Sequence, residues 1–239
     1  MVVTLDRPDR RNAVDGETAA ELSAAFRAFD ADPAMNVAAL TGAGGHFCAG
    51  FDLKALAEGT GPEVGDGDGP MGVTYLRLGK PVIAAIEGYC VAGGMELALW
   101  CDLRVAGSNA VFGIFNRRFG VPLVDGGTIR LARIAGQGLA MDLILTGRSI
   151  GAAEAERHGL VNRVVEPGRA LAEALALAER IAGFPQAGLR NDRLSLLEQW
   201  GLPLGQALVN ELRWGRKTMD SGESLAGAQR LASGEGRGT

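Results

Sequence analysis

The sequence predicts an α/β protein in which a parallel sheet is covered by helices and followed by a helical C-terminal region. Short apolar runs of strand length alternate with helical patterns as far as residue 184, and such repeated strand–helix units favour a buried sheet with helices outside it. From Pro185 onward the pattern is helical, without strands. We therefore predict an α/β core at residues 1–184 and a helical region at residues 185–239.

Each predicted element follows from a local pattern. In chain order they are a strand at 1–5, a helix at 16–31, a strand at 37–41, a helix at 53–58, a strand at 81–86, a helix from 93, strands at 103–106 and 110–113, helices at 127–134, 139–145 and 152–158, a strand at 161–165, and helices at 169–182, 186–200, 204–219 and 224–232. Asp15 and Asp52 are expected to cap the first two helices. The glycine-rich, acidic stretch 59–72 is interpreted as a mobile loop, with a lid as the alternative, and 116–126 as another loop.

At the centre of this pattern lie Gly93 and Gly94, where a strand passes into the start of a buried helix. The first amides of a helix have no partners within it and carry the positive end of its dipole, so they suit a bound oxyanion. Glu96 follows within one turn, and helical side chains lean back toward the N-terminus. This turn therefore offers an oxyanion site beside a base. The alternative is an ordinary glutamate that complements the helix dipole or closes a capping box.

Composition argues against several other classes. A net charge of −4 disfavours a nucleic-acid surface, and two histidines with three cysteines at no ligand spacing give no reason to expect a metal. No apolar run reaches the roughly 18 residues of a membrane span and no secretory signal is recognised, so we expect a cytoplasmic protein with reduced thiols and no membrane partner. Phosphate-binding loops, nucleophile elbows and dinucleotide fingerprints are not found either.

Six short motifs occur along the chain. They are DRPDRRNA at 6–13, FCAGFDL at 47–53, GYCVAGGMELALWCD at 88–102, GGTIRL at 126–131, LTGR at 145–148 and AERHGLVN at 155–162. In sequence and in order these motifs resemble those of the crotonase superfamily, the enoyl-CoA hydratases/isomerases. The resemblance covers about residues 2–183 well and the helical region loosely.

This resemblance implies a spiral of ββα units with a C-terminal trimerisation region, assembled as a homo-trimer or as a hexamer of two stacked trimers. It implies an acyl-CoA thioester as substrate, no separate cofactor, and an oxyanion hole made by the backbone amides of Phe51 and Gly93. The positions that match the family's CoA-binding residues are Arg10, Arg11, Ala13, Ala49, Asp52 and Leu53.

The helical region carries more large apolar residues than a helical extension free in solvent would carry. They are Leu194, Leu197, Trp200, Leu204, Leu208, Leu212 and Trp214. We predict that these side chains are buried against the body of the protein and against neighbouring subunits.

The sequence departs from the family at one catalytic position. Glu96 matches the first of the two glutamates of the hydratases, but Asn116 stands where the second is expected. An amide holds water or a substrate oxygen but carries no proton at neutral pH, and one missing acid–base group is worth roughly 10²–10⁴ in rate. Asp125 is a candidate replacement; a cap for the helix near Gly127 is the other interpretation of this residue.

Three functional hypotheses follow. The first is a crotonase-type enzyme with Glu96 as acid and base, with hydratase as the foremost activity and isomerase, decarboxylase or hydrolase as alternatives. The second is a catalytically weak acyl-CoA-binding protein, because of Asn116. The third is an enzyme of another class on the same fold, such as one that cleaves cyclic diketones without CoA. Arg10 and Arg11 matter in the first two hypotheses and not in the third.

Overall fold

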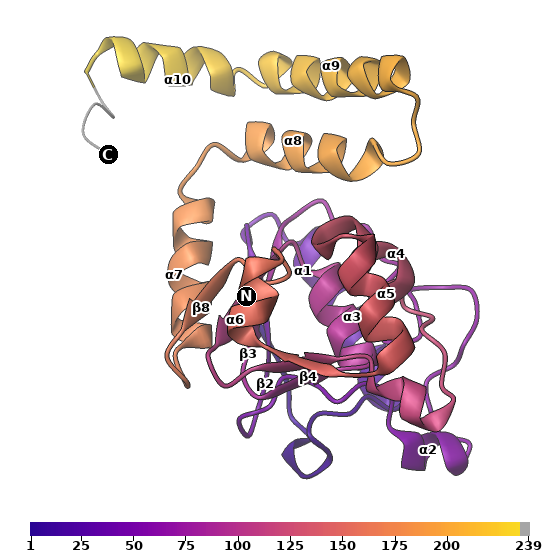
Figure 1. Cartoon of the computed structure of the whole chain (residues 1–239). Helices are drawn as coiled ribbons and strands as arrows, with labels where there is room; N and C mark the ends of the chain where they lie inside the picture. The colour runs from indigo at the N-terminus through magenta and orange to yellow at the C-terminus, as the bar shows by residue number, and fades with distance from the viewer. Residues whose placement is uncertain (235–239) are drawn as a thin grey trace. The chain divides into compact units, whose positions relative to one another are not determined.

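The computed structural model describes residues 1–234 and divides the chain into two compact units, one from Met1 to Glu179 and one that begins at Arg180 (Figure 1). The division lies inside helix α7 (Ala170–Ala182), a few residues before the boundary expected at 184. The first unit is the α/β part, and the second contains helices only, as far as residue 234.

The first unit is built on a five-stranded sheet of order β1-β2-β3-β5-β8, in which every neighbouring pair is parallel. Its strands are β1 (Val2–Leu5), β2 (Ala38–Gly42), β3 (Val82–Ile86), β5 (Leu103–Gly107) and β8 (Arg163–Val165). The central strand β3 is buried throughout, as expected for a parallel strand covered on both faces. The predicted α/β class is confirmed. The last strand begins later than predicted, because the amide of Val161 bonds back to the carbonyl of Ala155.

A second, smaller sheet contains β4 (Tyr89–Val91), β6 (Val111–Gly113) and β7 (Ser149–Gly151), with β6 antiparallel to β7. The sequence predicts only β6. The other two have three residues each, so neither contains enough alternation to be recognised without its partner. This sheet matters for function because β4 leads directly into helix α3.

The helices of the first unit lie close to their predicted positions. They are α1 (Gly16–Ala31), α2 (Leu53–Ala57), α3 (Gly93–Trp100), α4 (Gly127–Ala135), α5 (Gln137–Thr146), α6 (Ala152–Arg157) and α7, with short 3₁₀ helices η1 (Pro8–Arg10) and η2 (Phe115–Phe119). Both predicted caps are confirmed: Asp15 accepts a bond from the Thr18 amide, and Asp52 accepts bonds from the amides of Lys54 and Ala55. The stretch 116–126 was expected to be irregular, but it begins inside η2.

The stretch 59–72, expected to be a mobile loop, changes character along its length. It is mostly exposed up to residue 68, but Met71 is fully buried and belongs to the hydrophobic core, as does Val73 just after it. The end of this stretch is therefore a fixed part of the unit that packs against α3, as the closeness of Met71 to Gly93 shows.

The second unit contains α8 (Gln186–Glu198), α9 (Leu204–Asp220) and α10 (Glu223–Ala232). α8 and α9 pack together, with hydrogen bonds from Asn191 to Thr218 (2.9 Å) and from Trp214 to Glu198 (2.8 Å). Five of the seven apolar side chains predicted to be buried are exposed in the single chain: Leu197, Trp200, Leu204, Leu208 and Leu212. No helix within residues 1–234 combines the length and the apolar character needed to cross a membrane.

Candidate active site

A pocket with about 450 Å³ of empty volume lies at the junction of the 49–53 segment, the start of α3 and η2. Its lining residues are Ala49, Phe51, Leu53, Ala92, Gly93, Glu96, Phe115, Asn116, Phe119, Val121 and Pro122. Glu96 is the one ionisable side chain among them. The pocket is thus a mostly apolar cavity with few polar groups, which is the usual form of a site for a small organic substrate.

Phe51 lines this pocket, and the backbone on either side of it is held by hydrogen bonds to Val14. Val14 and Phe51 form an isolated parallel β-bridge. In it the Val14 amide donates to the Gly50 carbonyl (2.8 Å), and the Asp52 amide donates to the Val14 carbonyl (2.8 Å). Successive amides of an extended chain point to opposite sides, so the Phe51 N–H points away from Val14. Among the described residues, no acceptor bonds to it.

The second amide belongs to Gly93, the first residue of α3. Helix geometry leaves this N–H without an acceptor inside its own helix. The close approach of the two segments depends on glycines: a Cβ on Gly50 would lie 2.7 Å from the Gly93 nitrogen, and one on Gly94 would lie 2.1 Å from the Cys48 carbonyl oxygen. Ala92, just before, has φ 51° and ψ −126°, which is strained for a residue with a side chain. Phe51 and Gly93, the two residues predicted to supply oxyanion amides, therefore both line the pocket.

Glu96 is buried, with 2% of its surface exposed, and does not cap its own helix. Its Oε1 accepts hydrogen bonds from the amides of Asp125 (2.9 Å) and Gly127 (2.8 Å), at the start of α4. Burial raises the pKa of Glu96 to about 7, and the Gly127 amide works against this rise. A carboxyl with such a pKa exchanges a proton readily near neutral pH, which a general acid–base group requires.

Asn116 lies in the pocket wall and is 6% exposed. Its Nδ2 donates to the Val121 carbonyl (3.0 Å), which fixes the orientation of the amide. Its Oδ1 is buried and bonds to no group within residues 1–234. Asn116 therefore has an acceptor without a partner in the same pocket that Glu96 lines, and it has no proton to give from that atom.

Asp125 is not part of the pocket lining. Its carboxylate is fully buried and accepts a hydrogen bond from the Met71 amide (2.8 Å) and another from the Thr74 hydroxyl. The cap interpretation is wrong, since the N-cap position of α4 is occupied by Gly126 without a side-chain bond. The direction of the carboxylate also disagrees with a role as the missing second proton carrier, because the side chain bonds to the 71–74 segment rather than facing the pocket.

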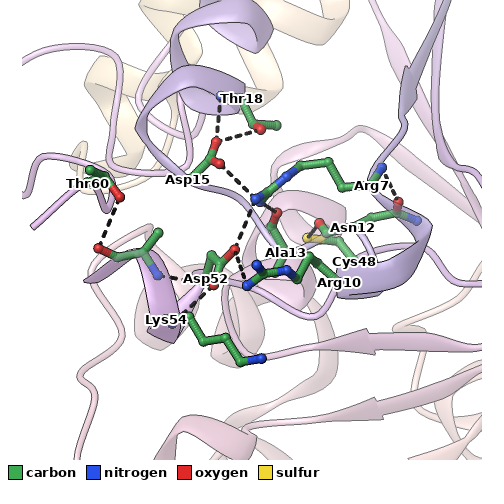
Figure 2. Close-up of polar contacts among 11 residues, drawn as sticks. Arg7, Arg10, Asn12, Ala13, Asp15, Thr18, Cys48, Asp52, Lys54 and Thr60 are labelled. Atoms are coloured by element: carbon green, nitrogen blue, oxygen red, sulfur yellow. Dashed lines mark hydrogen bonds and ion pairs between the residues drawn. The ribbon is translucent and has the colours of Figure 1, made fainter. Parts of the chain in front are cut away.

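The basic turn, residues 6–13, contains an ion-pair cluster (Figure 2). Asp52 is its buried centre: its Oδ2 lies 3.0 Å from Arg7 Nη2 and 3.6 Å from Arg10 Nη1. Arg7 also pairs with Asp15 (2.8 Å) and donates to the Ala13 carbonyl. The predicted positions Ala13 and Asp52 therefore hold the turn in place, and the Arg10 side chain stays 45% exposed.

The remaining predicted CoA positions are divided between turn and pocket. Arg11 is exposed and lies over the Tyr89 ring, 4.9 Å from its centroid. Ala49 and Leu53 line the pocket itself. Arg10 and Arg11 thus offer exposed guanidinium groups, which bind phosphate oxygens well.

The sequence did not predict several residues that line the pocket, nor the backbone amides that hydrogen-bond to Glu96. Phe115, Phe119, Val121 and Pro122 line the pocket from η2 and the following loop, and only their apolar character pointed to such a role. The amides that hold Glu96 are more than 25 residues away in sequence, so no local pattern reveals them. No cluster of three or more potential metal ligands is found in the part of the chain that the structure describes.

Comparison with known proteins gives a consistent result. The model of the enoyl-CoA hydratase/isomerase family matches residues 1–232. Enoyl-CoA hydratase EchA19 of Mycobacterium tuberculosis is 39% identical over 97% of this chain and 90% of its own. The mevalonyl-coenzyme A hydratase sidH of Aspergillus fumigatus is 37% identical over 84% of this chain and 81% of its own.

The fold is also similar to that of solved structures. The crystal structure of the enoyl-CoA hydratase EchA1 from Mycobacterium marinum matches with a TM-score of 0.92 and 37% identity, covering 97% of this chain and 91% of that chain. The similarity extends over both units of the chain, including the helical region that the sequence motifs covered only loosely.

Proposed function

Because the chain belongs to the enoyl-CoA hydratase/isomerase family of the crotonase superfamily, we propose that it hydrates an enoyl-CoA thioester, or dehydrates the corresponding 3-hydroxyacyl-CoA, in the pocket between Phe51, Gly93 and Glu96. One observation carries this proposal. The pocket is lined by Phe51 and Gly93, whose backbone amides make no hydrogen bond within residues 1–234, and by a single buried carboxyl, that of Glu96, whose pKa is raised to about 7. The names of two relatives, an enoyl-CoA hydratase and a mevalonyl-coenzyme A hydratase, agree with this chemistry.

The hydration step follows from the positions of these groups. The thioester oxygen accepts from the amides of Phe51 and Gly93, which stabilise the enolate that develops during reaction. Ionised Glu96 takes a proton from water as the water oxygen bonds to the β-carbon, and the electron pair of the double bond moves into the enolate. The enolate then collapses and takes that proton from Glu96 at the α-carbon, so one carboxyl serves as base and then as acid.

Asn116 holds the oxygen that reacts at the β-carbon. Its vacant Oδ1 accepts a hydrogen bond from the attacking water or, in the reverse direction, from the substrate hydroxyl. This contact orients the water without moving a proton. With one carboxyl fewer than the two-glutamate hydratases, we expect slower hydration, by roughly 10²–10⁴ if nothing compensates.

A panel of CoA thioesters tests the proposal. We expect turnover of enoyl- and 3-hydroxyacyl-CoA thioesters, measured by absorbance of the conjugated thioester, and none of malonyl-type thioesters. Binding of all of them without turnover of any would contradict hydration and favour an acyl-CoA-binding protein. Turnover of acyl groups without CoA would contradict the role given to Arg10 and Arg11.

Double-bond isomerisation is the second candidate. It moves one proton between the α- and γ-carbons and needs a single proton carrier, which matches a pocket with Glu96 as its one ionisable lining residue. A 3-enoyl-CoA in the same panel distinguishes the two activities, since its conversion to the 2-enoyl isomer requires no water.

We further propose a cytoplasmic homo-trimer or homo-hexamer that uses no cofactor besides the CoA of its substrate. Three free, buried cysteines support a reducing compartment. The exposed apolar residues of α8 and α9 support burial against other subunits. Sedimentation of the intact protein should give a trimer or hexamer, whereas a monomer at micromolar concentration would contradict the assembly.

A further inference from the structure

A seam of hydrogen bonds joins the segment 71–75 to the start of α4, behind the pocket. On one side, Asp125 Oδ1 accepts from the Met71 amide (2.8 Å) and from the Thr74 hydroxyl. Next to it, the Tyr75 hydroxyl donates to the Val124 carbonyl (2.5 Å). These bonds involve neither the pocket surface nor the oxyanion amides.

Arg130, in α4, adds two hydrogen bonds to this seam. Its Nη1 donates to the Asp125 carbonyl (2.8 Å), and its Nη2 donates to the Thr74 carbonyl (2.5 Å). Residue 125 is therefore held through both its side chain and its carbonyl. Such double attachment fixes the peptide groups on either side of it.

The same stretch of backbone holds the base. The amides of Asp125 and Gly127 both donate to Glu96 Oε1, and in the described chain Glu96 Oε2 has no hydrogen-bond partner. Gly127 is in close contact with this carboxyl, since a Cβ placed on it would lie 2.8 Å from Oε1. The orientation of Glu96 thus depends on where the backbone at 125–127 lies.

We propose that Asp125 is a positioning residue: by tying the backbone at 125–127 to Met71 and Thr74, it fixes the two amides that hold Glu96 Oε1 and so leaves Oε2 directed at the substrate. This inference rests on the proposed role of Glu96 as acid and base. It assigns Asp125 no contact with substrate.

Asp125 also acts on Glu96 through its charge, separately from its effect on the backbone. Its Oδ2 is buried and makes no hydrogen bond to any described residue, and burial raises the pKa of the side chain. A buried, half-satisfied carboxyl lowers stability. The carboxyl also repels ionised Glu96, which contributes to the raised pKa of that base.

Two variants separate the position of this side chain from its charge. Asp125→Asn removes the charge and keeps an oxygen that accepts from Met71 and Thr74, whereas Asp125→Ala removes both charge and acceptor. The charged groups that act on Glu96 are Asp125 and Arg130; the other lining residues, from the 49–53 segment, α3 and η2, are neutral. The acid limb of the pH profile of kcat/KM therefore follows the pKa of Glu96.

We expect the acid limb of the pH profile to move to lower pH in Asp125→Asn, with kcat within about 1.5-fold of the parent. In Asp125→Ala we expect kcat to fall at least about tenfold, KM to change less than threefold, and the acid limb to lie above that of Asp125→Asn, because the amides that stabilise ionised Glu96 are no longer fixed. Equal kcat and equal acid limbs in the two variants would overturn the proposal.

Controls keep the result interpretable. Glu87→Gln is the matched variant, because this carboxylate also accepts from two backbone amides, Gly168 (2.9 Å) and Ala170 (3.1 Å), but lies outside the pocket. It should leave kcat and the acid limb of the pH profile unchanged.

A second variant is available if Asp125→Ala does not fold. Thr74→Val removes one hydrogen bond of the seam and should lower kcat about threefold at constant KM; an unchanged kcat would overturn the inference. If Glu96→Gln keeps full activity, the proposed function fails instead.

Discussion

Asp52 and Glu96 each accept hydrogen bonds from two backbone amides at or just before the start of a helix, and their surroundings differ. Asp52 accepts from the amides of Lys54 (3.1 Å) and Ala55 (3.3 Å) in α2, and Arg7 and Arg10 lie beside it. Glu96 accepts from two amides at the start of α4, and no ion pair to it occurs among residues 1–234. Amide bonds alone therefore do not decide what a buried carboxylate does.

The difference lies in the compensation of charge. At Asp52 two guanidinium groups neutralise the carboxylate, which suits a structural centre for the basic turn. At Glu96 burial outweighs the amides, and the pKa rises to about 7. A buried carboxyl without a paired cation is therefore suited to carry a proton.

The largest effect should come from Glu96→Gln, which keeps shape and acceptor but removes the proton carrier. Turnover should fall at least about 10²-fold, with binding of the CoA thioester changed only a few-fold, as measured by steady-state kinetics and calorimetry. Retained turnover would contradict the assignment of Glu96 as the base.

The same variant should be more stable than the parent at alkaline pH. A pKa raised from 4.5 to about 7 means that the folded state favours the protonated carboxyl, so this contribution is complete below pH 4.5 and is lost as pH rises through about 7. Above that pH the parent should be less stable than Glu96→Gln by about 3 kcal/mol, and near pH 4.5 the two should be similar. Urea titrations at pH 5 and pH 8 measure this difference.

The next effect should come from Asn116→Glu, which gives Glu96 a second carboxyl across the pocket. We expect hydration of crotonyl-CoA to rise about tenfold, because a separate acid then serves the α-carbon. The two carboxyls should raise each other's pKa, moving the acid limb to higher pH. Asn116→Gln is the matched control for length; an equal gain in this variant would exclude proton transfer as the cause.

A smaller effect is expected at Asp52, where the charge is structural. Asp52→Asn keeps the helix cap but leaves Arg7 and Arg10 without their shared partner, so unfolding free energy should fall by about 2 kcal/mol. The kcat of the folded enzyme should stay within about threefold. A large loss of kcat without loss of stability would contradict a purely structural role for the Asp52 charge.

The smallest effect should come from replacing Arg10 and Arg11 by Ala. Exposed guanidinium groups bind phosphates weakly and in a salt-dependent way, so the Kd for CoA should rise about fivefold at low salt and less at high salt. Arg27→Ala, at an exposed ion pair with Asp68, is a control that removes one exposed guanidinium elsewhere and should not alter the Kd. An unchanged Kd in the double variant would place the phosphates elsewhere.

The sequence predicts well those features whose causes are local. The helix caps Asp15 and Asp52 precede their helices directly, and Gly93 stands at the start of a helix as its neighbours require. Most elements of the main sheet follow from apolar runs that are buried on both faces.

What the sequence does not predict depends on contacts between distant segments. β4 and β7 are strands because of their pairing with β6. The direction of Asp125 is set by Met71 and Thr74, about 50 residues earlier, and its own neighbours suggested a helix cap instead. The partners of Glu96 are equally remote, so its raised pKa could not be anticipated from the motif around it.

The proposed oxyanion amides have a consequence for mutational scanning. Every residue except proline has an amide N–H, so replacing Phe51 or Gly93 by alanine tests packing and leaves the proposed catalytic N–H in place. Substitutions can shift these amides only by changing the backbone around them. Suitable positions are Ala92, which has a positive φ just before Gly93, and Gly50, whose lack of a side chain lets the Gly93 nitrogen approach closely. If the proposed mechanism holds, a side-chain scan would therefore assign most of the catalysis to Glu96 and would not detect the contribution of the two amides.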